Sequence, residues 1–96
     1  MSPKNKIKLK LLRKELDKLD YNLLKIIKIR TEIVKKVLSL KSYKKEIIDK
    51  KRIKTILSKI KKESLKRNID PKITQRIWKN MIWSYIDYEK RNFKKK

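Results

Sequence analysis

The sequence predicts an all-α protein made of three helices, one long, one short and one of medium length. The 96 residues include no Gly and only two Pro, so little interrupts a helix. Apolar residues recur at steps of three and four, which is the helical period. No segment alternates apolar and polar residues as a half-buried strand would, and no internal repeat is present. We therefore expect one small helical domain over residues 1–96.

The first helix is predicted over about residues 8–41. Steps of three and four trace one continuous seam along it, and every seam position but one is aliphatic. At ~1.5 Å per residue such a helix is roughly 50 Å long, more than a compact monomer of this size measures across. A second copy of the chain is the simplest cover for the seam, whose members are Leu9, Leu12, Leu16, Leu19, Leu23, Ile26, Arg30, Ile33, Val37 and Leu40.

The second helix is predicted over about residues 49–67, after a loop at 42–47 that loses the helical period. Asp49 can cap its N-terminus. Its apolar positions, with one Ser among them, are Ile53, Ile56, Leu57, Ile60, Ser64 and Leu65.

The third helix is predicted over about residues 71–93 and has the clearest start signal. Ile69 can form a hydrophobic staple, Asp70 can cap the helix, and Pro71 fits its first position. We expect the basic tail, 94–96, to be frayed. The apolar face comprises Ile73, Ile77, Trp78, Met81, Ile82, Tyr85 and Ile86.

Composition excludes several kinds of chemistry. Without Cys or His the chain forms no disulfide and offers no thiol or imidazole for zinc binding or catalysis. We expect neither cofactor nor metal. No apolar run is long enough to cross a membrane, and the first residues lack the apolar core of a signal peptide, so we expect a cytoplasmic protein without a membrane partner.

The formal net charge of +22 is typical of proteins that bind nucleic acid. However, the lysines occur in every segment, and abundant Lys, Ile and Asn without Gly or Ala suggest A/T-rich codon usage. We do not expect a dedicated nucleic-acid partner. A non-catalytic basic dimer that binds nucleic acid remains the alternative from another class.

Three basic residues stand out against the helical pattern. Arg30 occupies a seam position, where a guanidinium needs an anionic partner, and we expect that partner to be a ligand. Lys41 returns to within about 20° of Arg30, whereas Arg13 is rotated about 100° away. Arg13 would therefore serve another cavity, or one in a partner chain. Snorkelling of Arg30 and simple solvation of Lys41 are the plainer interpretations.

Charged residues also mark the other two helices. Asp49 and Arg52 are three residues apart and can act at one site. Glu89 lies on the apolar side of the third helix, one turn after Tyr85. Taken singly, Asp49 could be only a cap, and Glu89 could pair with Lys90 or with Arg91 of another chain.

Over residues 11–93 the chain resembles the all-helical chorismate mutase family. The matching segments are LLRKELDKLDYNLL, IRTEIVKKV, IIDKKR and IDPKITQRIWKNMI, and the spacing of Arg13, Arg30 and Lys41 agrees without a gap. The resemblance implies an intertwined helical homodimer with two active sites, each receiving Arg13 from the opposite protomer.

The resemblance also implies the reaction, the rearrangement of chorismate to prephenate on the route to phenylalanine and tyrosine. Arg13 and Arg30 would hold the two carboxylates of this small dianionic substrate, with help from Arg52. Lys41 would stabilise the charge that develops on the ether oxygen. Asp49 and Tyr85 would help to bind or position the substrate.

Two positions depart from the family pattern. Ile53 stands where many mutases have a glutamate that accepts a hydrogen bond from the ring hydroxyl. An apolar residue there is similar to the isochorismate pyruvate-lyase branch, which forms salicylate and pyruvate, so isochorismate is the alternative substrate. Glu89 replaces a glutamine that donates to the ether oxygen, and a glutamate can donate only when it is protonated.

Overall fold

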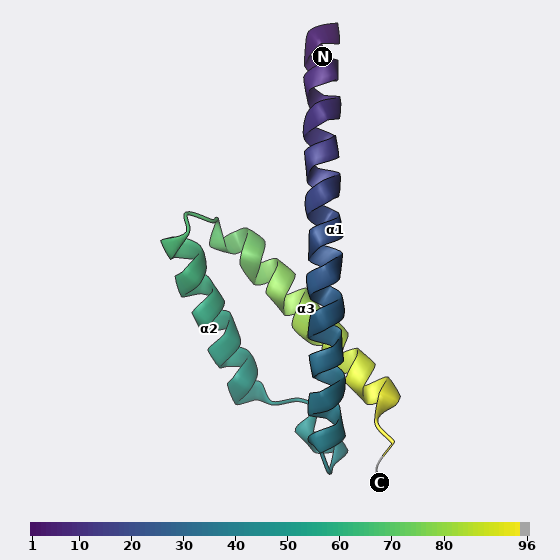
Figure 1. The fold of residues 1–96 in the computed structure, drawn as a ribbon. Coiled ribbons are helices and arrows are strands. Elements are labelled where there is room, and N and C mark those ends of the chain that lie inside the picture. The colour runs from purple at the N-terminus through teal and green to yellow at the C-terminus, as the bar shows by residue number, and fades with distance from the viewer. Residues whose placement is uncertain (95–96) are drawn as a thin grey trace. The chain divides into compact units, whose positions relative to one another are not determined.

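The computed structural model describes residues 1–94, which form three α-helices and one short 3-10 helix (Figure 1). The elements are α1 (Pro3–Leu40), η1 (Lys44–Glu46), α2 (Lys50–Lys66) and α3 (Pro71–Asn92). This confirms the all-α class and the order of a long, a short and a medium helix. Residues 95 and 96 of the basic tail lie outside the described residues. None of the described helices combines the length and apolar character needed to cross a membrane.

Helix α1 begins at Pro3, five residues before the expected start near residue 8. Ser2 precedes it and caps the helix: the backbone N–H of Asn5 donates to Ser2 Oγ at 3.1 Å. The backbone N–H of Lys6 closes the first turn on the Ser2 carbonyl at 2.9 Å. Pro3 occupies the first helical position, where its missing N–H costs no hydrogen bond. Residues 3–7, which the prediction left outside the helix, are therefore helical.

The chain divides into two compact units, Met1–Ile33 and Val34–Lys96. The first consists of Met1, Ser2 and most of α1. It has no buried residue, and its apolar seam is open to solvent in the single chain. Leu12, Leu16, Leu19, Leu23, Ile26 and Ile33 are 54–59 % exposed.

The second unit contains the hydrophobic core. Helices α2 and α3 lie side by side and run in opposite directions (Figure 1). The buried members of the core are Ile47, Ile82 and Ile86, and Leu38, Ile48, Ile53, Ile56, Leu57 and Phe93 pack around them. Of the apolar face predicted on α3, Ile82 and Ile86 are buried, whereas Ile73 and Ile77 are 56 % and 52 % exposed. Leu65, expected on the apolar face of α2, is 58 % exposed.

Polar contacts tie α2 to α3 near their joined ends. The Ser64 hydroxyl donates to the Ile60 carbonyl at 2.7 Å and lies 2.7 Å from the Thr74 hydroxyl. Further along, Gln75 Nε2 donates to the Leu57 carbonyl at 2.9 Å. Ser64 is 3 % exposed and satisfied, so a polar residue is accommodated at an inward position.

The turn between α2 and α3 is formed without glycine. Asn68 adopts a positive φ of 56°, a conformation that Asn tolerates better than other non-glycine residues. The N–H groups of Ile69 and Asn68 donate to the carbonyls of Ser64 and Leu65, which closes α2 in a Schellman arrangement. Asp70 then caps α3 by accepting from the Lys72 N–H at 2.9 Å, with Pro71 at the first helical position as predicted.

The predicted loop at 42–47 is more ordered and more buried than its sequence indicates. It contains η1, and it ends in Ile47, which is 3 % exposed and belongs to the core. The loop is thus anchored at the end that leads into α2.

Candidate active site

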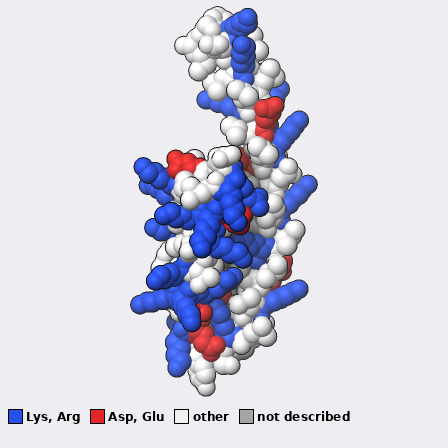
Figure 2. Space-filling model, turned by 90° about the vertical axis from the view of Figure 1, so that its left-hand side faces the viewer, with Lys and Arg blue, Asp and Glu red and all other residues white. Residues whose placement is uncertain are grey.

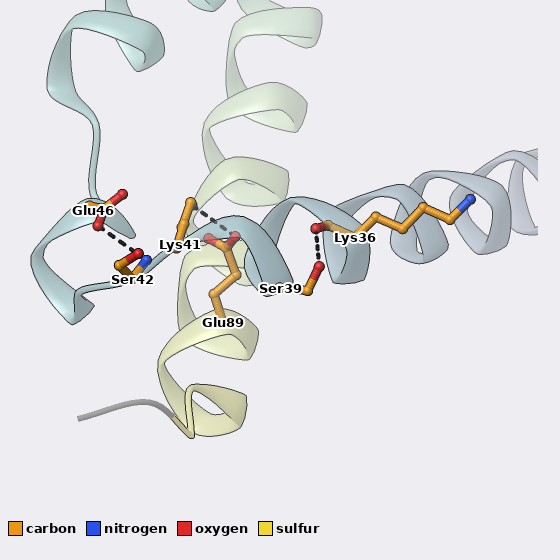
Figure 3. A network of polar contacts seen from close by, with 6 residues as sticks. All are labelled: Lys36, Ser39, Lys41, Ser42, Glu46 and Glu89. Atoms are coloured by element: carbon orange, nitrogen blue, oxygen red, sulfur yellow. Dashed lines mark hydrogen bonds and ion pairs between the residues drawn. The ribbon is translucent and has the colours of Figure 1, made fainter.

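Lys41 lies just after α1 and makes a salt bridge with a residue distant in sequence. Its Nζ is 3.0 Å from Glu89 Oε1 near the end of α3, and Figure 3 shows the two side chains meeting between the elements. The Lys41 side chain is 18 % exposed and that of Glu89 is 7 % exposed. A carboxylate this buried requires a cationic or hydrogen-bonding partner. Lys41 provides it.

The plainer interpretation of Lys41 is therefore wrong, because Lys41 is not simply solvated. Within the chain Glu89 pairs with Lys41 rather than with its neighbour Lys90. Arg91 has its Nε 2.8 Å from Asp87 Oδ2, one turn away on α3, and a pairing of Glu89 with Arg91 of another chain stays a prediction. Lys41 also follows the helix rather than ending it, since α1 stops at Leu40.

Glu46 fixes the backbone directly after Lys41. Its Oε1 accepts from the N–H groups of Ser42 and Tyr43 at 3.2 and 2.9 Å, and Figure 3 shows the contact with Ser42. These two backbone donors, in the loop that follows α1, are thereby satisfied within the loop itself. Sequence reasoning did not single out Glu46.

Lys41 and Asp49 line the same surface hollow, together with Glu46, Ile48 and Lys50. The hollow thus brings together two of the predicted site residues, one cationic and one anionic. The Asp49 side chain also caps α2, because Oδ1 accepts from the Arg52 N–H at 2.9 Å. The predicted capping role is confirmed, and the hydrogen bond fixes the start of the helix that carries Arg52.

Ile53 lies in a neighbouring hollow between α2 and α3. Leu57 and Trp83 line it with Ile53, and Lys50 lines both hollows. Ile53 is half-buried and packs against the core, whereas Trp83 is 52 % exposed. Tyr85, one turn before Glu89 on α3, is half-buried. An apolar wall thus adjoins the hollow of Lys41.

Arg13 and Arg30 belong to the first unit, and the other predicted site residues belong to the second. Arg13 is exposed, and it lines a hollow on α1 with Lys6, Leu9, Lys10, Lys14 and Asp17. Arg30 is half-buried and already interacts with another group of the chain. Binding of a ligand by Arg30 stays a prediction.

Positive charge surrounds these residues. Helix α2 carries eight Lys and Arg but a single acid, Glu63, in 17 residues. Figure 2 shows Lys and Arg over much of one face, with few acidic side chains between them. The surface potential therefore favours anionic ligands.

Comparison with known families agrees with this arrangement. The family model described as chorismate mutase type II matches residues 12–90, most of the chain. The chain belongs to the chorismate mutase type II family. None of the curated proteins matches it, and no solved structure does. Nothing in the family match is specific to the isochorismate pyruvate-lyase branch.

Membership in the chorismate mutase family identifies the chain as an enzyme of aromatic amino acid biosynthesis that rearranges chorismate to prephenate. The match covers all eight predicted site residues, from Arg13 to Glu89. It leaves out residues 3–11, the first turns of α1.

Proposed function

We propose that the chain acts as a homodimeric chorismate mutase in which Lys41 stabilises the breaking ether bond. The observation that carries the proposal is the placement of the Lys41 ammonium, which is held on Glu89 and lines a hollow with Asp49. The rearrangement breaks a C–O bond while a C–C bond forms, and negative charge develops on the ether oxygen. A fixed, partly desolvated cation stabilises that charge without a nucleophile or proton relay.

Glu89 leaves Lys41 able to bind substrate. An ammonium group has three donors, and the contact with Glu89 Oε1 at 3.0 Å uses one of them. The other two can reach the ether oxygen and a substrate carboxylate. In its ionised form, Glu89 orients the Lys41 ammonium. In its protonated form, the Glu89 carboxyl group can itself donate to the ether oxygen.

The arginines hold the substrate. Each site takes Arg30 and Arg52 from one protomer and Arg13 from the other, and their planar guanidinium groups bind the two carboxylates bidentately. Asp49 and Tyr85 help to position the ring. Support for the dimer comes from the exposed seam of α1, since Leu16, Leu19 and their neighbours leave an apolar stripe that one chain does not cover.

Replacing Lys41 tests the proposal. In Lys41→Met we expect kcat for prephenate formation to fall about 10²–10³-fold, the scale of losing one preorganised donor. Because this change leaves the Glu89 carboxylate buried without a partner, the matched variant is Lys41→Met with Glu89→Gln, which removes both charges. A double variant that folds with wild-type stability yet retains activity would refute the role of Lys41.

The single variant Glu89→Gln tests the role of Glu89 separately from that of Lys41. An amide donates at every pH, so we expect this variant to form prephenate at least as fast as the wild type near neutral pH. A loss as large as that of Lys41→Met would instead show that the carboxylate itself is required.

Ile53 favours a second candidate, pyruvate elimination from isochorismate. Ile53 offers no acceptor for a ring hydroxyl, and it lies in an apolar wall with Leu57 and Trp83. Purified protein should be given chorismate and isochorismate in parallel, with prephenate, salicylate and pyruvate followed. Prephenate as the faster product supports the mutase. Salicylate and pyruvate as the main products would support isochorismate pyruvate-lyase activity, with Ile53 as the residue that distinguishes it from a mutase.

A further inference from the structure

The first turns of α1 are strongly basic. Residues 3–14 contain six Lys and Arg, and the first acidic residue of the chain is Glu15. Over its full 38 residues α1 has twelve basic and four acidic side chains. Half of the basic residues of α1 therefore lie in its first turns, ahead of every acidic residue.

The basic residues of this segment divide between two faces. Lys6 is within about 20° of Arg13 around the helix and Lys10 within about 60°, whereas Lys4 and Lys8 are about 180° and 140° away. The structure agrees with this division, since Lys6, Lys10, Arg13 and Lys14 line one hollow that Lys4 and Lys8 do not. We call these four residues the Arg13 face.

We propose that Lys6 and Lys10 extend the substrate site of the partner subunit, concentrating the dianionic substrate next to Arg13. The inference rests on the proposed function, which places Arg13 in that site. At ~1.5 Å per residue, Lys10 and Lys6 are about 4.5 and 10.5 Å from Arg13 along the axis, distances no greater than about one Debye length at ~0.1 M salt and well below it at ~0.01 M. Both side chains are exposed and so can turn toward an approaching anion.

Asp17 bounds the Arg13 face on its other side. It lines the same hollow and is one turn beyond Arg13, so its carboxylate opposes the approach of an anion. Removing Asp17 should therefore have the opposite effect to removing Lys6 and Lys10. The family model begins at residue 12, so neither lysine belongs to the matched region.

The experiment measures kcat and KM for chorismate against ionic strength in three variants. In Lys6→Gln with Lys10→Gln we expect KM to rise about three-fold at ~0.01 M salt, with kcat unchanged and the difference lost at ~0.5 M. The matched control is Lys4→Gln with Lys8→Gln, which removes equal charge from the opposite face and should leave KM near the wild-type value. Asp17→Asn should lower KM at low salt. Glutamine preserves helix propensity in the lysine variants.

Three results would overturn the inference. Equal increases in KM from the two lysine pairs would mean that net charge alone attracts the substrate. An unchanged KM at every salt concentration would mean that Lys6 and Lys10 take no part in binding the substrate. A change confined to kcat would place the lysines in another role. Failure of the proposed function is distinguishable, because the wild type itself would then form no prephenate.

Discussion

The two units of this chain use the same kinds of residue in opposite ways. In Val34–Lys96, isoleucines from the loop and from α3 are buried against one another, with Ile47 3 % and Ile86 6 % exposed. In Met1–Ile33, leucines and isoleucines of equal size remain more than half exposed along one seam. The second unit folds around its own core, whereas the first carries a surface suited to another chain. Stability and assembly can therefore be perturbed separately.

The largest effect is expected from Arg13 and Lys41, which belong to different units and which the proposed function places in the same active site. Arg13→Ala and Lys41→Ala should each reduce activity more than 100-fold. When the two variants are unfolded together and refolded, half the dimers are mixed and one site in each has both residues, so activity should recover to about a quarter of wild type.

Recovery requires Arg13 and Lys41 to meet across the dimer. Refolding each variant alone is the control and should recover nothing. An inactive mixture of correctly sized dimers would place both residues in the same protomer.

Breaking the seam should disassemble the protein without unfolding the second unit. Leu19 is 58 % exposed in the single chain, and Leu19→Lys places a charge on the seam that the proposed dimer would bury. We expect sedimentation to show monomers at micromolar concentration and mutase activity to be lost.

Tyr21→Lys is the matched control for the seam variant. Tyr21 is 68 % exposed on the same helix and is not a seam position. This variant should remain dimeric and active. Dissociation of both variants alike would argue that the seam has no special part in assembly.

A core substitution should behave differently. Ile86→Ala removes a buried side chain of the second unit and should cost about 2–4 kcal/mol of unfolding free energy. Ile77→Ala, at a position 52 % exposed on the same helix, is the comparison. Chemical denaturation at several protein concentrations measures both. The Ile86 loss should be independent of concentration, whereas a loss at Ile77 that grows on dilution would place that residue in the dimer interface.

The smallest expected effect is at the turn between α2 and α3. Asn68 has φ 56°, where a Cβ is unfavourable, so Asn68→Ala should destabilise the protein by about 1 kcal/mol. Asn68→Gly should be neutral or slightly stabilising, because glycine adopts this conformation freely. Thermal unfolding compares the two. A more stable alanine variant would contradict this account of the turn.

Signals confined to a few residues were the most dependable part of the sequence. Asp49 and Asp70 were predicted as helix caps because the relevant donors are only two or three residues away. The same reasoning applied to Ser2 and Pro3 would have placed the start of α1 correctly, since they form the same cap and proline pair as Asp70 and Pro71.

Features that depend on tertiary packing were harder to predict. Ile47 was assigned to a loop because periodicity describes one helix at a time and cannot show that a loop residue enters the core. The partner of Glu89 was uncertain for the same reason, since Lys41 is 48 residues earlier. Glu46 was missed because it lies next to lysines in a loop, where no helical periodicity distinguishes it from its neighbours. The resemblance to chorismate mutases supplied Ile53 and Tyr85 as site residues and gave Arg13 and Arg52 their roles, which periodicity alone could not do.

Because Lys41 is held by Glu89, its proposed role in catalysis depends on the C-terminal end of α3 being folded. Glu89 lies three residues before Asn92, the last residue of that helix, and a helix terminus opens more readily than a core. Each such opening would release the Lys41 ammonium into water, away from the position in which we propose that it stabilises the reaction. Heating should then reduce activity before the main unfolding transition, and hydrogen exchange at residues 89–92 should increase over the same temperature range.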